Sequence, residues 1–376
     1  MRETKGKPGV GPELRPLLKR ISVLALAILL PFAGAAHAQS PATLLSEPTP
    51  SDIPDSWKLW IGEYTHFDPN VVGVVYVLSE KDGFIWISER HGDARDAGYI
   101  TRARLSSPSA PPKTMEGGQA LVLGIDSPGS SPVLIVGKVT IGKRPLDTGT
   151  SQPAHINVVR PIDELRVEAL AATPPKETRS FRKPDLVELA PLDPKIHLDI
   201  RYASANDFLG TPVYSQARAF LQRPAAEALL RVQQKLKPLG YGLLIHDAYR
   251  PWYVTKIFWD ATPPEGKIFV ADPAQGSRHN RGCAVDLTLY DLATGKPIEM
   301  PGTYDEMSPR SFPDYPGGTS LQRWHRDLLR RAMESEGFTV YEAEWWHFDY
   351  KDWKEYPILN VPFEKLGLDS VAGAVH

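Results

Sequence analysis

Two side chains that commonly bind metal ions lie near each other in the segment SRHNRGCAVDLTLY, which spans residues 277–290. His279 and Asp286 are seven positions apart. The part VDLTLY alternates and is rich in β-branched and aromatic residues, which predicts a strand. On a straight strand an odd separation directs two side chains to opposite faces of the sheet. The two residues can therefore share one ion only if the chain turns between them.

The turn that this requires is present in the same segment. Gly282 ends the sequence NRG and can adopt the positive φ of a tight turn. In the strand after it, Val285 and Leu287 alternate on one face and predict the side that packs on the hydrophobic core. Asp286 lies on the other face, where its small neighbours leave space. We therefore expect His279, which precedes the turn, to converge with Asp286.

A second cluster, EAEWWHFDY, contributes Glu344 and His347. Catalytic zinc is typically held by three His or carboxylate ligands and keeps a fourth position for a water molecule, whose pKa it lowers towards neutrality. His279, Asp286 and His347 match this ligand set and predict one zinc ion per chain. A separate carboxylate must move the proton of the water to the leaving group, and Glu344 is the candidate. Arg250, in HDAYRP, is a candidate for contacting the oxyanion of a tetrahedral intermediate.

Each of these residues also has a structural interpretation. A single histidine in a strand is more often a core or surface residue than a metal ligand. Asp286 could pair with Arg278 or Arg281, and Arg250 could form a structural ion pair with Asp247. The two tryptophans of EWW could be core residues. Taken singly, the structural interpretations are the commoner ones, and only the combination of motifs favours a catalytic site.

The elements that must position these residues predict an α+β domain, because strands and helices mix without a repeating βαβ rhythm. Strands are predicted at residues 196–204 and 242–250. Helices are predicted at residues 223–240, 252–260 and 320–337.

The last of these helices carries an apolar stripe whose members follow a spacing of 3, 4 and 4: Leu321, Trp324, Leu328 and Ala332. The stripe predicts the face of the helix that packs on the domain core. His325 then falls on the solvent side, and we expect it, like His246, to be a structural residue.

The first half of the chain has a different composition. Many of the 36 prolines of the whole chain gather here in stretches typical of loops and linkers, and between these lie β-like segments such as VVGVVYVL and GFIWIS. The Asp-Gly of SEKDG predicts a hairpin between those two segments. We therefore predict a Pro-rich lead and a small, mostly antiparallel β-rich accessory domain over residues 39–172, a linker over 173–189, a catalytic domain over 190–363 and a C-terminal tail over 364–376.

Residues 1–38 have the pattern of a cleaved signal peptide. Lys19 and Arg20 precede the apolar run ISVLALAILLPFAGA, and AHA before residue 39 matches a signal-peptidase site. A membrane anchor would need about 20 apolar residues, which is longer than this run. We expect an exported protein, periplasmic or secreted, without a stable membrane span after cleavage.

Charge and cysteine content narrow the class of protein. With 43 Lys and Arg against 45 Asp and Glu, the composition gives no sign of a nucleic-acid partner. The sequence contains no Gly-rich phosphate loop. Cys283 is the single cysteine, so an internal disulfide cannot form and stability must come from the core or from a metal.

The motifs SRHNRGCAVDLTLY, DAYRP and EWWHF together resemble the D-alanyl-D-alanine dipeptidases, the vancomycin-resistance dipeptidase group of the zinc D,D-peptidases of the M15 type. The resemblance covers about residues 193–361. It implies a compact α+β zinc D,D-peptidase domain, here preceded by the small, mostly antiparallel β domain. The implied catalytic set is the zinc ligands His279, Asp286 and His347, the general base Glu344 and the transition-state arginine Arg250.

The same resemblance implies contacts with a substrate. Asp305, in MPGTYDEMSPRS, matches the aspartate that holds the free ammonium group of the substrate, and Ser277 and Tyr202 match substrate-side positions. Two features depart from the family pattern. Cys283 stands near the ligands where a small residue such as serine is usual, and the chain adds an export signal and a β-rich domain, a candidate for contact with the cell wall.

The implied activity is zinc-dependent hydrolysis of D-alanyl-D-alanine, or of a related free D,D-dipeptide, in cell-wall peptide metabolism, with a metal-activated water attacking the peptide carbonyl. A peptidoglycan D,D-carboxypeptidase could use the same site. A third interpretation is a wall-binding protein with a structural zinc. Glu344 and Arg250 argue against the third, because a structural zinc site is closed and needs neither residue.

Overall fold

The computed structural model describes residues 49–50, 54–65, 74–81, 83–90, 99–106, 113–114, 120–125, 131–144 and 155–366. The predicted signal peptide and most of the predicted C-terminal tail lie outside these residues, so both stay predictions. Within the described ranges, no helix combines the length and the apolar character needed to cross a membrane.

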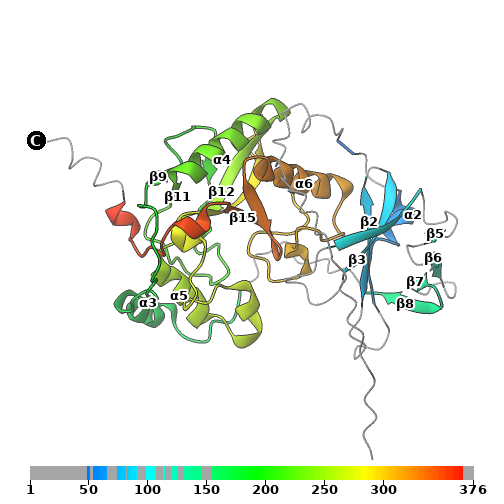
Figure 1. Ribbon diagram of the computed structural model, residues 1–376, viewed down its shortest axis with the longest axis horizontal. Helices are drawn as coiled ribbons and strands as arrows, with labels where there is room; N and C mark the ends of the chain where they lie inside the picture. The colour runs from blue at the N-terminus through cyan, green and yellow to red at the C-terminus, as the bar shows by residue number, and fades with distance from the viewer. Residues whose placement is uncertain are drawn as a thin grey trace, which may run out of the picture. The chain divides into compact units, whose positions relative to one another are not determined.

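The first half forms an eight-stranded antiparallel sheet, preceded by the short helix α2 (Asp55–Lys58), as Figure 1 shows. In chain order the strands are β1 (Gly62–Thr65), β2 (Val75–Lys81), β3 (Phe84–Arg90), β4 (Tyr99–Leu105), β5 (Lys113–Thr114), β6 (Ala120–Ile125), β7 (Pro132–Val136) and β8 (Val139–Lys143). The order across the sheet is β4-β3-β2-β1-β8-β7-β6-β5. Buried side chains such as Leu78, Ile85 and Leu134 give this sheet a hydrophobic core of its own.

The hairpin predicted from SEKDG is confirmed. β2 and β3 pair antiparallel, with Lys81 opposite Phe84. Gly83 has a φ of 73°, the left-handed conformation that the tight turn requires and that glycine adopts without strain.

The second half is built on a five-stranded sheet with the order β10-β12-β13-β15-β14. Its strands are β10 (His197–Leu198), β12 (Tyr241–Asp247), β13 (Ala284–Asp291), β14 (Phe338–Tyr341) and β15 (Glu344–Tyr350). β10 pairs parallel with β12, and the other pairs are antiparallel. A separate two-stranded sheet joins β9 (Leu186–Glu188) to β11 (Phe220–Gln222).

Four helices accompany the five-stranded sheet: α3 (Ile162–Ala171), α4 (Arg223–Leu236), α5 (Trp252–Ala261) and α6 (Ser320–Glu334). α4 and α6 pack against each other and against strands of the sheet, and α3 packs against α5 (Figure 1). The mixture of helices with a largely antiparallel sheet agrees with the predicted α+β class of this half.

The strand predicted at residues 196–204 is mostly wrong. Only β10 is extended, and a 3₁₀ turn follows at Arg201–Ala203. The backbone closes on itself there, because the N–H of Ala203 donates to the carbonyl of Ile200. This turn carries Tyr202 into the interior, where the side chain is 2% exposed.

The predicted buried face of α6 is also wrong in part. His325, expected on the solvent side, is buried and shares a hydrogen bond of 2.9 Å with the hydroxyl of Tyr241, whereas Leu321 is exposed. The residues that α6 buries lie on two adjacent stripes and include both Leu328 and Leu329. His325 falls between these stripes, so the helix is rotated relative to the single stripe that the spacing predicted.

α3 and the segment after it are tied to the second half of the chain. Leu165 and Ala169 of α3 are buried in the same hydrophobic core as α5. In the predicted linker, Glu177 accepts hydrogen bonds from the Arg281 guanidinium at 2.7 Å and from the N–H of Ile358 at 2.8 Å. The domain limits drawn from the sequence stay a prediction, but both segments are structurally integrated with the five-stranded sheet domain.

The packing of α3 yields a stability prediction. Leu165 is completely buried, so Leu165→Ala should lower the free energy of unfolding by about 2–5 kcal/mol. Val167, on the same helix, is 70% exposed, and Val167→Ala should change it by no more than about 0.5 kcal/mol. Urea denaturation of the full chain, followed by tryptophan fluorescence, measures both. Equally small changes in the free energy of unfolding of the two variants would show that α3 does not contribute to this core.

Candidate active site

The pairing of β13 with β15 brings together two of the three predicted metal ligands. The strands run antiparallel with Asp286 directly opposite His347. Directly opposite residues have Cβ atoms about 4.5–5.5 Å apart, so their side chains meet on one face of the sheet. On the other side of β13, Asp247 of β12 is also opposite Asp286, at a β-bulge.

His279 reaches this pair from outside the sheet. It begins a short 3₁₀ turn, His279–Arg281, which ends at Gly282 with a φ of 68°. The turn expected at Gly282 is therefore present. The Nδ1–H of His279 donates to the carbonyl of Ala248 at 2.6 Å, which directs Nε2 towards Asp286.

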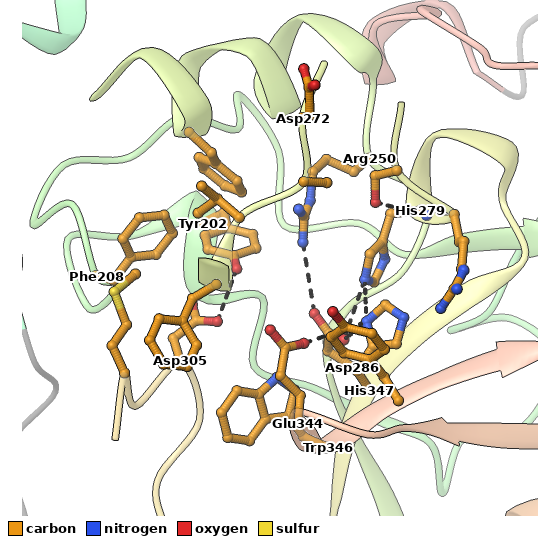
Figure 2. Close-up of a pocket in the computed structure, with 18 of the residues that line it drawn as sticks. Tyr202, Phe208, Arg250, Asp272, His279, Asp286, Asp305, Glu344, Trp346 and His347 are labelled. Atoms are coloured by element: carbon orange, nitrogen blue, oxygen red, sulfur yellow. Dashed lines mark hydrogen bonds and ion pairs between the residues drawn. The ribbon is translucent and has the colours of Figure 1, made fainter. Parts of the chain in front are cut away.

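Three atoms of these residues form a tight triangle, as Figure 2 shows. His279 Nε2 lies 3.0 Å from His347 Nδ1 and 3.3 Å from Asp286 Oδ1. His347 Nδ1 lies 3.0 Å from the same oxygen. Asp286 Oδ1 is buried and has no hydrogen-bond partner among the described residues, although both rings approach it. A buried, unpaired carboxylate oxygen beside two imidazole nitrogens fits a metal cation.

The pKa shifts of two residues in the triangle also support a metal site. Burial alone would raise the pKa of Asp286, but the adjacent rings of His279 and His347 hold it well below its usual range. Burial alone would lower the pKa of His347, but Asp349 and Asp286 raise it to about 10. The first shift keeps Asp286 ionised, and the second shows that the carboxylates around His347 favour a positive charge there. An ionised ligand and a site that favours positive charge are both what a metal site requires.

Asp349 orients His347 and was missed in the sequence. The Nε2–H of His347 donates to Asp349 Oδ1 at 3.0 Å, which directs Nδ1 at the triangle and makes it the nitrogen that gives up its proton to a metal. The other oxygen of Asp349 pairs with the guanidinium of Arg278. A signal was available, since residues two apart on a strand share a face and Asp349 follows His347 by two.

Glu344 lies beside the triangle at the start of β15. It is three residues from His347, an odd separation, but the ladder between β14 and β15 is irregular here and pairs Tyr341 with Glu344. Glu344 Oε2 lies 3.7 Å from His347 Nδ1. Burial, together with the Asp286 carboxylate, raises the pKa of Glu344 to about 7. A carboxylate with such a pKa can accept and release a proton near neutral pH.

Arg250 is buried at the wall of the same pocket. Its Nε and Nη2 donate to Asp247 Oδ2 at 2.9 and 2.8 Å, so the structural pair considered from the sequence is present. Nη2 also lies 3.7 Å from Asp286 Oδ2. The guanidinium is thereby fixed next to the metal-ligand triangle. Arg281, by contrast, pairs with Glu177, and neither it nor Arg278 binds Asp286.

Asp305 and Tyr202 lie together across the pocket from the triangle, with Glu344 between (Figure 2). The Tyr202 hydroxyl donates to Asp305 Oδ1 at 3.2 Å, while Asp305 Oδ2 is buried without a partner among the described residues. Burial, with the charges of Asp286 and Glu344, raises the pKa of Asp305 well above its usual value. An incoming cation would relieve this repulsion.

Tyr304 is a second residue that the sequence did not reveal. Its hydroxyl lies 3.0 Å from the Tyr202 hydroxyl and 3.1 Å from Asp286 Oδ2. A chain of hydrogen-bonding oxygens therefore runs from Asp305 through both tyrosines to Asp286. Only the position of Tyr304 next to Asp305 in the sequence could have drawn attention to it.

These residues line a cavity of about 340 Å³, whose apolar wall includes Phe208 and Trp346. Ser277 lies at its edge, where the hydroxyl accepts a hydrogen bond of 3.2 Å from the N–H of His279. Cys283 is fully buried and does not line the cavity, and burial raises the pKa of its thiol. The thiol is thus shielded from the reagents that would oxidise it.

Comparison with known proteins identifies relatives of the second half of the chain. Residues 182–364 match the peptidase M15 family, described as D-ala-D-ala dipeptidase. A D-alanyl-D-alanine dipeptidase of Escherichia coli is 36% identical over 179 residues, which cover 48% of this chain and 91% of the relative. Enzymes of the same name from Enterococcus faecalis and Streptomyces coelicolor are 35% identical over 187 residues (44% and 92% covered) and 34% over 175 (42% and 87%).

The triangle of ligand atoms yields a metal prediction. Protein purified without chelator should carry about one zinc ion per chain, as three protein ligands and a water imply. His279→Ala and His347→Ala should lose it, measured by elemental analysis after dialysis. His325→Gln is the matched control, because His325 is buried and hydrogen-bonded to Tyr241, away from the triangle. Full zinc occupancy in both ligand variants would contradict the assignment.

Proposed function

Because the chain belongs to the D-alanyl-D-alanine dipeptidases of the M15 peptidase family, we propose that it hydrolyses free D-alanyl-D-alanine with the help of one zinc ion. The observation that carries this proposal is the placement of Glu344 beside the triangle of His279, Asp286 and His347. A ligand set open to a pocket, with a carboxylate poised near neutrality at its side, suits hydrolysis better than a purely structural site.

His279, Asp286 and His347 would hold the zinc ion, which supplies Lewis acidity and lowers the pKa of a water molecule. Asp349 keeps the proton of His347 on Nε2, and Ala248 keeps that of His279 on Nδ1. Both rings therefore present a lone pair to the same point. The two hydrogen bonds thus set which nitrogen of each ring keeps its proton when the metal is bound.

Glu344 and Arg250 have separate roles in the hydrolysis: proton transfer and stabilisation of the developing negative charge. Glu344 accepts a proton from the attacking water and returns it to the amine that leaves. Arg250 donates hydrogen bonds to the oxygen of the peptide carbonyl as negative charge develops on it. Asp247 holds the guanidinium in place, so little reorganisation is needed when the charge forms.

Asp305 favours a dipeptidase over a carboxypeptidase. A free dipeptide has its ammonium group one residue before the scissile bond, and Asp305 lies across the pocket from the triangle with an unpaired oxygen. A longer or acylated peptide would place a neutral amide there, so Asp305 would either stay ionised without a counter-charge or take up a proton. Either outcome loses the charge pair that a free ammonium group forms with Asp305.

Export of the enzyme is part of the proposal and rests on the sequence of residues 1–38, which lie outside the described residues. In the periplasm of a bacterium, an exported enzyme would meet peptides released from the cell wall. The β-rich sheet lies outside the residues that match the family. We assign to it contact with the wall as a working hypothesis.

Removal of the general base gives the sharpest activity test. Glu344→Gln should keep the zinc ion and the fold but lower kcat about 10²- to 10⁴-fold, because an amide cannot take the proton of the attacking water. Glu342→Gln, an exposed glutamate two residues away, is the matched control and should leave kcat unchanged. Loss of zinc from Glu344→Gln would instead identify Glu344 as a ligand.

The role of Asp305 predicts how activity depends on substrate length. The wild-type enzyme should cleave D-alanyl-D-alanine at least about 10²-fold faster than an N-acylated tripeptide that ends in D-alanyl-D-alanine, corresponding to about 2.7 kcal/mol. Asp305→Asn should narrow this ratio, chiefly by raising KM for the dipeptide. Asparagine tolerates the φ of 57° at this position.

Asp272→Asn is the control for that experiment, since Asp272 also lines the pocket but is not paired with Tyr202. It should leave the ratio of the two rates near the wild-type value. A wild-type enzyme that prefers the acylated tripeptide would exclude the dipeptidase and support a wall carboxypeptidase that uses the same site.

A further inference from the structure

A free dipeptide carries a charge at each end, and the proposed function accounts for only one of them. The ammonium group lies before the scissile bond, where Asp305 can bind it. The carboxylate lies one residue after the bond, on the metal side of the pocket, and needs a cationic partner. Among the described residues that line the pocket, the two arginines are Arg250 and Arg278.

Arg250 already has other partners and is not available to the carboxylate. It is 8% exposed, its Nε and Nη2 both donate to Asp247, and it faces the carboxylate of Asp286. Its position beside the ligand triangle suits the carbonyl oxygen, which lies at the scissile bond. The carboxylate of the product residue extends beyond that point.

Arg278 lies on the required side of the pocket. It directly precedes His279, and its Nη1 donates to Asp349, which in turn accepts a hydrogen bond from His347. The guanidinium carbon lies 5.6 Å from the ring centroid of Tyr341 and 5.0 Å from that of Trp353. These contacts hold the guanidinium at the pocket wall, one residue removed from the metal-ligand candidate His347.

The guanidinium is also available to a ligand. The Arg278 side chain is 37% exposed, four times the value of Arg250 in its ion pair. A guanidinium has five N–H donors, and Asp349 is the one polar side-chain partner of Arg278 among the described residues. The remaining donors can form the paired hydrogen bonds by which arginine recognises carboxylates.

We infer that Arg278 binds the C-terminal carboxylate of the dipeptide. This inference rests on the proposed function and adds to it a second charged contact, which restricts the enzyme to substrates with a free carboxylate one residue after the scissile bond. Arg278 is then a determinant of specificity for the substrate, separate from the residues that perform the hydrolysis.

A different role for Arg278 must be separated from this one. Through Asp349 the arginine touches a metal ligand, and it could act only by positioning His347. In that case its loss would weaken zinc binding and would affect every substrate equally. If Arg278 instead recognises the carboxylate, removal of its side chain should weaken binding only of ligands that carry the carboxylate.

The test compares two ligands on two proteins. Zinc-loaded Glu344→Gln protein, which binds but turns over slowly, is titrated by calorimetry with D-alanyl-D-alanine and with its C-terminal amide, with and without Arg278→Gln. We expect Arg278→Gln to weaken binding of the dipeptide about tenfold or more, as loss of a charge-assisted contact implies. Binding of the amide should change less than about twofold, because the amide has no carboxylate to lose.

Two further variants complete the design. Arg278→Lys keeps the charge without the planar fork, so the preference for the dipeptide over the amide should persist in reduced form. Asp349→Asn should weaken zinc retention, measured by chelator competition, but should keep the preference for the dipeptide over the amide. Equal losses for dipeptide and amide in Arg278→Gln, or no loss for either, would overturn the inference. Absence of dipeptide binding to the zinc-loaded parent would overturn the proposed function itself.

Discussion

The register between β13 and β15 is the constraint on which the site depends. It places Asp286 opposite His347 on the pocket face and Val285 opposite Phe348 on the core face. A slip of one residue would exchange these faces and bury the carboxylate in the apolar core. Val285 and Phe348 are both fully buried. The hydrophobic core therefore fixes the distance between Asp286 and His347, the two candidate ligands, and His279 needs only the turn at Gly282 to join them.

The electrostatics of the pocket follow from this register, because it concentrates negative charge. Seven carboxylates lie in or next to the cavity: Asp247, Asp272, Asp286, Asp305, Glu306, Glu344 and Asp349. Arg250 and Arg278 balance only part of this charge, and buried charges without partners are costly. The raised pKa values of Glu344 and Asp305 express the imbalance. Without a metal ion and a substrate ammonium group, bound protons compensate part of this negative charge.

The sequence was most informative where chemistry and local geometry coincide. The turn at Gly282 could be predicted because only a change of direction lets His279 reach Asp286. Contacts that depend on distant segments could not be predicted. The Tyr304 hydroxyl forms a hydrogen bond with that of Tyr202 across about a hundred positions, and the sequence around Tyr202 predicts a strand where the structure has a turn. His325 was misplaced because a 3, 4 spacing does not distinguish one buried stripe from two adjacent ones.

Recognition of charge at both ends would explain how the cavity selects a dipeptide. Hydrogen bonds to charged groups contribute about 1.5–3 kcal/mol each. Asp305 is bound by Tyr202 and Arg278 by Asp349, so the two residues share no partner and their contributions should be nearly additive. A peptide extended at one end would lose one contribution, and a peptide extended at both ends would lose about 3–6 kcal/mol, or roughly 10²- to 10⁴-fold in affinity. Selection by length would then need no steric wall, only two charges held at a fixed separation by the strands and turns that also carry the metal ligands.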